Sequence, residues 1–133
     1  MDPARLKDLA ARYGIRLLLQ FGSSVTGRLH PRSDLDLAVL LEHAPSSLSV
    51  ELDLASDLQA LADDREVDLA LINRADPLFL KQILEHCRVL YGPARALHEL
   101  KMYAFKRYQD HRRYLAMERA YVSRKIEESA TGK

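Results

Sequence analysis

Hydrophobic and polar positions divide the first part of the chain into alternating helical and extended segments. Residues 3–13 carry apolar side chains at helical spacing and are followed by Gly14, which predicts a helix that ends there. Residues 15–21 and 35–41 are nearly continuous apolar runs, which is typical of strands covered on both faces. We therefore expect two central strands, separated by the polar loop of residues 22–34.

The same pattern continues beyond the second strand. Residues 48–62 predict a helix, 66–72 a third strand, 78–86 a short helix and 88–91 a fourth strand. The helix over 48–62 repeats apolar side chains at helical spacing, and its expected stripe is Leu48, Leu52, Ala55, Leu58 or Gln59, and Ala62.

The last third of the chain has a different character. Residues 94–129 contain no Gly or Pro and predict one long helix, or two with a bend near Asp110–His111. An unbroken helix would be about 50 Å long, more than a small domain can cover. We therefore divide the chain into a domain of residues 1–93 and a helical extension of residues 94–133, which packs on the domain, on a partner, or on both. Tyrosines and arginines are interleaved along it, and both types are enriched at protein interfaces: Tyr103, Tyr108, Tyr114, Tyr121, Arg107, Arg112, Arg113, Arg119 and Arg124.

Composition fits one globular domain. The chain has 133 residues, of which 47% are apolar and 29% charged. A single cysteine, Cys87, excludes an intrachain disulfide. We expect a cytoplasmic protein without a membrane segment, because no apolar run reaches the roughly 20 residues that span a bilayer and the N-terminus lacks the apolar core of a signal peptide.

The net charge of +1 conceals an asymmetry. From Glu99 onward there are nine Lys/Arg and five Asp/Glu, against eleven and fourteen before it. A mildly basic tail could meet nucleic acid or an acidic protein surface. Acidic residues are interspersed along the tail, so we expect no direct nucleic-acid binding.

The candidate chemistry lies in residues 21–41, FGSSVTGRLHPRSDLDLAVLL. Side chains at i and i+2 of a strand share a face, so Asp34 and Asp36 project together. Paired carboxylates suit a hard divalent cation such as Mg²⁺, which also binds substrate phosphates. Gly22 lets the backbone approach a bulky anion, and the following hydroxyls and cations add donors. The candidate nucleotide-binding residues are Gly22, Ser23, Ser24, Arg28 and Ser33.

A third carboxylate, Asp68, interrupts the third strand. Val67, Leu69 and Leu71 fall on one face of that strand, with Asp68 and Ala70 on the other. A carboxylate within an apolar strand is either a strand-edge residue in contact with water or a functional group, and we favour function.

Gly22-Ser23, ten residues, and then Asp34-x-Asp36 resemble the signature of the DNA polymerase beta-like nucleotidyltransferase superfamily. The longer strings GSSVTGR and SDLDLAV look like its minimal nucleotidyltransferase (MNT) domain. The resemblance implies an α/β fold with a small mixed sheet flanked by helices, like the polymerase beta palm, and places the third acidic residue at Asp68. One departure is Cys87, where the family pattern has a glycine.

The resemblance also implies an activity. MNT proteins of this size are typically antitoxins that transfer AMP from ATP to a tyrosine of a HEPN-domain ribonuclease toxin. Asp34, Asp36 and Asp68 would then be catalytic and would hold two Mg²⁺ ions. This chain lacks the Arg-x4-His motif of HEPN proteins, so the toxin is expected as a separate chain in a hetero-oligomer. Two alternatives stay open, namely a non-catalytic antitoxin that acts by contact, and a small-molecule nucleotidyltransferase such as an aminoglycoside enzyme.

Overall fold

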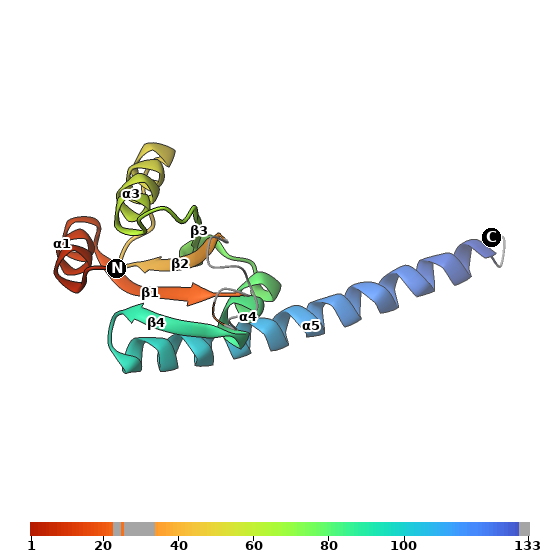
Figure 1. Ribbon diagram of the computed structural model, residues 1–133. Coiled ribbons are helices and arrows are strands. Elements are labelled where there is room, and N and C mark those ends of the chain that lie inside the picture. The colour runs from red at the N-terminus through yellow and green to blue at the C-terminus, as the bar shows by residue number, and fades with distance from the viewer. Residues whose placement is uncertain (23–24, 26–33, 131–133) are drawn as a thin grey trace.

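A four-stranded mixed sheet in the order β3-β2-β1-β4 forms the centre of the computed structural model, which describes residues 1–22, 25 and 34–130 (Figure 1). The mixed α/β fold and the long C-terminal helix that the sequence predicts are both confirmed. In chain order the elements are α1 Pro3–Tyr13, β1 Ile15–Phe21, β2 Leu35–Leu41, α3 Leu48–Leu61, β3 Val67–Leu71, the 3-10 turn η1 Ile72–Arg74, α4 Pro77–Glu85, β4 Cys87–Tyr91 and α5 Ala94–Ala130.

Strand directions decide which residues meet at each edge of the sheet. β1 pairs antiparallel with both β2 and β4, whereas β2 and β3 are parallel. Parallel neighbours need a crossover, and α3 supplies it. The start of β2, the start of β3 and the end of β1 therefore lie at one edge.

Each face of the sheet has its own hydrophobic core. Leu18, Leu37 and Val39 pack with α1 and α3 on one face. Leu17, Leu19 and Ala38 pack with α4 and α5 on the other. Because both faces are covered, β1 and β2 read as nearly continuous apolar runs.

Local sequence explains the helix ends. The Asp2 side chain accepts a hydrogen bond from Ala4 N at the start of α1, and Gly14 ends that helix with φ 67°. Asp76 caps α4 through Phe79 N. His86 ends α4 with φ −136°, a backbone conformation that does not require glycine, and Cys87 is simply the first residue of β4.

The expected face of α3 is wrong in its first half. Leu48 and Leu52 are 65% and 61% exposed, whereas Leu54, Leu58 and Leu61 are buried. The first turns of α3 extend beyond the sheet, so their apolar side chains have no surface to cover (Figure 1). Periodicity identified the helix, but tertiary packing selected the buried stripe.

α5 is one continuous helix of 37 residues, about 55 Å long at 1.5 Å per residue. Its buried residues are Ala96, Leu100 and Ala104, all in the first third. Every residue from 112 to 130 is exposed, and Figure 1 shows this part projecting away from the sheet. Within the described residues, neither α5 nor another helix is long and apolar enough to cross a membrane.

Candidate active site

Three carboxylates meet at the edge of the sheet where β2 and β3 begin. Asp36 and Asp68 are partners in the parallel β2–β3 register, and Asp34 directly precedes β2. The Leu35 N–H donates to the Glu66 carbonyl over 2.7 Å, which fixes the two strand starts against each other. The structure thus brings together the three acidic residues that the sequence singled out.

These carboxylates influence one another electrostatically. The pKa of Asp36 is raised above its ordinary value, first because the side chain is partly buried and then because Asp68 and Asp34 add negative charge nearby. Neighbouring negative charges of this kind favour a bound cation. A cation bound here would offset the repulsion that Asp68 and Asp34 exert on the ionised Asp36 carboxylate.

Gly22 directly follows β1 and lies against Asp36. Its φ of +76° belongs to the left-handed region, and a Cβ added there would lie 3.0 Å from Asp36 Oδ2. The Gly22 N–H donates to the His86 carbonyl over 3.1 Å, which holds this turn to the start of β4. The backbone conformation therefore favours glycine, and any Cβ there would oblige the Asp36 carboxylate to shift by a few tenths of an ångström.

Ser23, Ser24, Arg28 and Ser33 lie outside the described residues, so their predicted contacts with a nucleotide stay predictions. In the part of the chain that is described, no group of three or more His, Cys, Asp or Glu side chains is arranged to hold a metal ion. The donor chemistry still fits Mg²⁺, because carboxylate oxygens are its preferred protein ligands and Asp36 bears repulsion from two neighbours. Asp34, Asp36 and Asp68 remain the predicted ligands.

Sequence reasoning missed an aromatic pair next to this site. Phe21 and Phe79 pack edge to face, with ring centroids 6.2 Å apart and an interplanar angle of 77°. Phe21 is the last residue of β1, directly before Gly22, and it packs on the α4–α5 face of the sheet. Asp36 shares that face, because it lies two residues before Ala38. Only the packing of α4 on β1 connects the two rings, and no local pattern in the sequence reports it.

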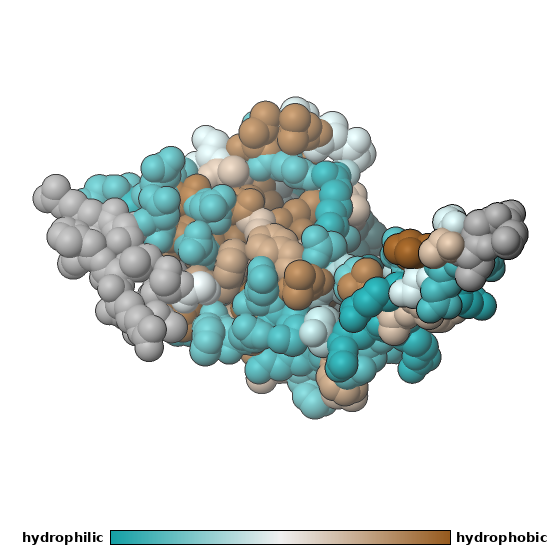
Figure 2. All heavy atoms as spheres, turned by 90° about the vertical axis from the view of Figure 1, so that its right-hand side faces the viewer, coloured by the Kyte–Doolittle hydropathy of each residue, from teal (hydrophilic) through white to brown (hydrophobic). Residues whose placement is uncertain are grey.

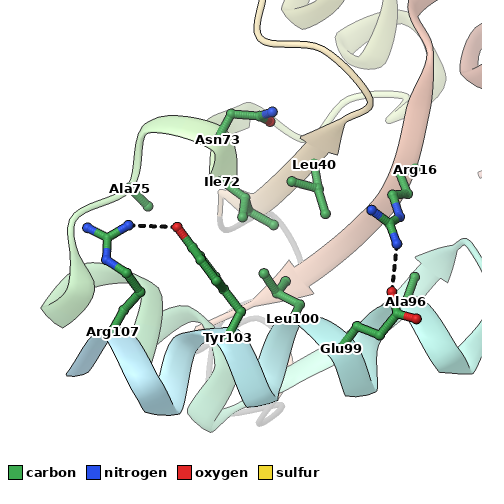
Figure 3. A pocket seen from close by; sticks show the side chains of 10 residues that line it. All are labelled: Arg16, Leu40, Ile72, Asn73, Ala75, Ala96, Glu99, Leu100, Tyr103 and Arg107. Atoms are coloured by element: carbon green, nitrogen blue, oxygen red, sulfur yellow. Dashed lines mark hydrogen bonds and ion pairs between the residues drawn. The ribbon is translucent and has the colours of Figure 1, made fainter. Parts of the chain in front are cut away.

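A cavity of about 390 Å³ lies at the opposite ends of the strands (Figure 3). Arg16 Nη2 pairs with Glu99 Oε2 over 2.6 Å at one end, and Arg107 Nη1 donates to the Tyr103 hydroxyl over 2.7 Å at the other. Leu40 and Ile72 line its floor, close to where β2 and β3 end. Because the acidic residues lie where those strands begin, this cavity is distinct from the candidate active site.

Known structures share this fold over nearly the whole chain. A crystal structure of a toxin–antitoxin with AMP-PNP contains a chain that is 22% identical, with a TM-score of 0.71 and coverage of 96% of this chain and 99% of that one. A structure of a tri-AMPylated Shewanella oneidensis HEPN toxin in complex with an MNT antitoxin gives 20% identity, a TM-score of 0.65 and coverage of 94% and 95%. Spectinomycin adenyltransferase from Enterococcus faecialis, with ATP and spectinomycin, gives 17% identity and a TM-score of 0.53, with coverage of 73% of this chain and 57% of that enzyme.

The comparison with curated protein sequences yields no match. Residues 4–96 match the family model described as "Polymerase beta, Nucleotidyltransferase". This range contains all four strands of the sheet and all three acidic residues. The resemblance found in the sequence is thereby confirmed, and the chain belongs to the polymerase beta nucleotidyltransferase family.

Proposed function

We propose that this protein is an antitoxin that transfers AMP from ATP to a tyrosine of a cognate HEPN ribonuclease toxin and thereby neutralises it. The observation that carries the proposal is the meeting of Gly22, Asp36 and Asp68 at one edge of a nucleotidyltransferase fold. The toxin–antitoxin structures with the same fold support the choice of partner, since one holds AMP-PNP and another a tri-AMPylated HEPN toxin.

The proposed reaction assigns a role to each predicted residue. The backbone at Gly22 and the Ser23 hydroxyl hold the β and γ phosphates of ATP, with Ser24, Arg28 and Ser33 nearby in the loop. Asp34 and Asp36 would hold Mg²⁺, which when bound neutralises phosphate charge and lowers the pKa of the attacking hydroxyl.

Asp68 completes the reaction scheme, either as a further ligand or as the base that accepts the proton of the acceptor hydroxyl. The acceptor oxygen forms a bond to the α-phosphorus, the bond from that phosphorus to the bridging oxygen breaks, and pyrophosphate leaves with the electron pair. The products are an AMP ester of the acceptor and pyrophosphate.

A small-molecule acceptor is less well supported. This chain matches the toxin–antitoxin chains over 95% to 99% of their length, but it spans only 57% of the spectinomycin enzyme. A contact-only antitoxin has a specific observation in its favour, because the exposed part of α5 offers a surface for binding without chemistry.

An intact-mass spectrum of the cognate HEPN protein, incubated with this chain, ATP and Mg²⁺, tests the proposal. We expect a gain of one or more AMP masses, and no gain with the Asp34→Asn, Asp36→Asn double variant. If wild type leaves the mass unchanged while a stable complex forms and the toxin is neutralised, transfer is refuted and contact inhibition replaces it.

A further inference from the structure

An unpartnered apolar seam runs along the exposed part of α5. Tyr108, Leu115 and Val122 are spaced seven residues apart and therefore lie on one side of the helix, and Ile126 follows Val122 by one turn. Leu115, Val122 and Ile126 are 38%, 47% and 63% exposed. Tyr108, at the domain end of the seam, has the Lys81 ammonium group 5.2 Å from its ring centroid, whereas every residue from 112 to 130 is exposed.

The seam continues into a groove on the domain. A groove of about 320 Å³ lies between α4 and α5. Leu84, Ala104, Phe105 and Tyr108 line it together with Lys101 and the Lys81–Glu85 ion pair. Ala104 and Tyr108 are one helical turn apart, so the groove and the seam share the same side of α5. We call the two together the α5 track (Leu84, Ala104, Tyr108, Leu115, Val122 and Ile126); His111 and Arg112 occupy the turn between Tyr108 and Leu115.

The track begins beside the candidate active site. α4, which forms one wall of the groove, ends at Glu85, and the next residue, His86, accepts the hydrogen bond from Gly22 N. Figure 1 shows α5 leaving the domain at the end of the sheet where β1 terminates. A partner lying along the track would therefore reach the edge that carries the three carboxylates.

Basic side chains along one flank of the track favour a partner with acidic side chains. Arg112 and Arg119 each follow a track residue by four positions, and Lys101 lies eleven residues before Arg112, so the three share one flank. In the described part of the chain, none of the three forms an ion pair. Figure 2 looks at the molecule from this end and shows apolar side chains among hydrophilic ones on the projecting helix.

We propose that the α5 track is the docking surface for an amphipathic helix of the acceptor protein, with apolar side chains on the track and acidic side chains facing Lys101, Arg112 and Arg119. The seven-residue repeat suits a helix packed lengthwise, and the groove accepts an anchoring side chain. This inference rests on the proposed function, because it assumes a protein acceptor.

The test uses the full chain, the co-expressed cognate HEPN protein and two pairs of matched variants. Leu115→Glu with Val122→Glu disrupts the seam. Met117→Glu with Tyr121→Glu is its control, since Met117 and Tyr121 are 67% and 55% exposed and lie on other sides of the helix. Arg112→Glu with Arg119→Glu reverses the basic flank. Arg113→Glu with Arg124→Glu makes the same charge change on the far side of the helix.

We expect the seam and flank variants to weaken binding to the HEPN protein at least about tenfold by calorimetry, and the two controls to change it by less than about threefold. Affinity of the wild type should fall with added salt, and the flank variant should lose that dependence. Titration with a fluorescent ATP analogue and Mg²⁺ should be the same for all five proteins, because the substituted residues lie outside the nucleotide site.

Each other outcome gives a clear answer. Seam and flank variants that bind and modify the HEPN protein like wild type overturn the docking proposal and leave the transfer proposal standing. Binding that depends on the track, without any mass change in the HEPN protein, supports docking and refutes transfer. If the seam variant changes only self-association in light scattering, the track pairs two copies of this chain, and the acceptor proposal is wrong.

Discussion

The carboxylate of Asp36 lies beside Gly22, so close that a Cβ on that glycine would be 3.0 Å from Asp36 Oδ2. The turn after β1 and the first carboxylate inside β2 are therefore one structural unit. A substitution at either residue should therefore alter the position of the other.

Gly22→Ala tests this relationship. The left-handed backbone at φ +76° disfavours alanine by about 1–2 kcal/mol, and the new methyl group must displace the Asp36 carboxylate. We expect lower stability in urea unfolding and loss of most nucleotidyl transfer. Gly14→Ala is the control, because its φ is also positive, at +67°, but a Cβ there would make only an ordinary contact with Glu42, at 3.9 Å, and β1 begins beside it at the other edge of the sheet. If Gly22→Ala retains full transfer activity, the contact with Asp36 has no functional role.

Asp36→Asn should stabilise the protein when metal is absent. The pKa of Asp36 is raised in the folded state, so folding disfavours the ionised carboxylate and stability falls as the pH rises through and above the ordinary value of 3.8. Removing the charge should therefore raise the melting temperature in EDTA at pH 7, and this gain should vanish below about pH 3.8, where the wild-type carboxylate is protonated in both states.

Added Mg²⁺ should stabilise the wild type more than Asp36→Asn, which is the opposite of the order expected in EDTA. An ion that binds the folded state stabilises it by mass action, and the wild type keeps the ligand that the variant has lost. We expect Mg²⁺ to raise the melting temperature of the wild type more than that of Asp36→Asn, measured by differential scanning fluorimetry. Equal shifts in the two proteins would argue against a metal ion at Asp36.

Asn73 should contribute to stability without contributing to chemistry. Its side chain accepts from Leu41 N and donates to Leu41 O, both over 2.9 Å, and so closes the end of β2. Asn73→Ala leaves both backbone groups without this partner and should cost about 1–2 kcal/mol in urea unfolding. Asn73→Asp keeps the acceptor but places a carboxylate oxygen against the Leu41 carbonyl oxygen, so it should cost at least as much as Asn73→Ala. ATP binding should be unchanged in both variants, because Asn73 lies at the edge of the sheet opposite the carboxylates.

Removing residues 112–133 should leave the domain folded. Every residue from 112 to 130 is exposed, whereas Leu100 and Ala104 hold α5 to the sheet and are retained. We expect the free energy of unfolding to change by less than about 1 kcal/mol. Leu100→Ala, by contrast, should cost about 2–5 kcal/mol because it opens a cavity in the core. A large loss of stability on truncation would show that the projecting helix supports the domain.

The sequence by itself determined the order and type of the elements and the pairing of Asp34 with Asp36 near the start of a buried strand. These features follow from periodicity and capping over a few residues, and Asp2, Gly14 and Asp76 mark the helix ends as local chemistry requires. The family resemblance implied that Asp68 joins Asp34 and Asp36, but only the tertiary structure decided that Asp68 pairs in register with Asp36, that Gly22 lies against the Asp36 carboxylate, and that Phe79 packs on Phe21. It also decided that α3 buries Leu54 in place of Leu52. Strand order, register and the choice of a buried face depend on contacts between residues far apart in the chain, and no local pattern of side chains specifies which of those contacts form.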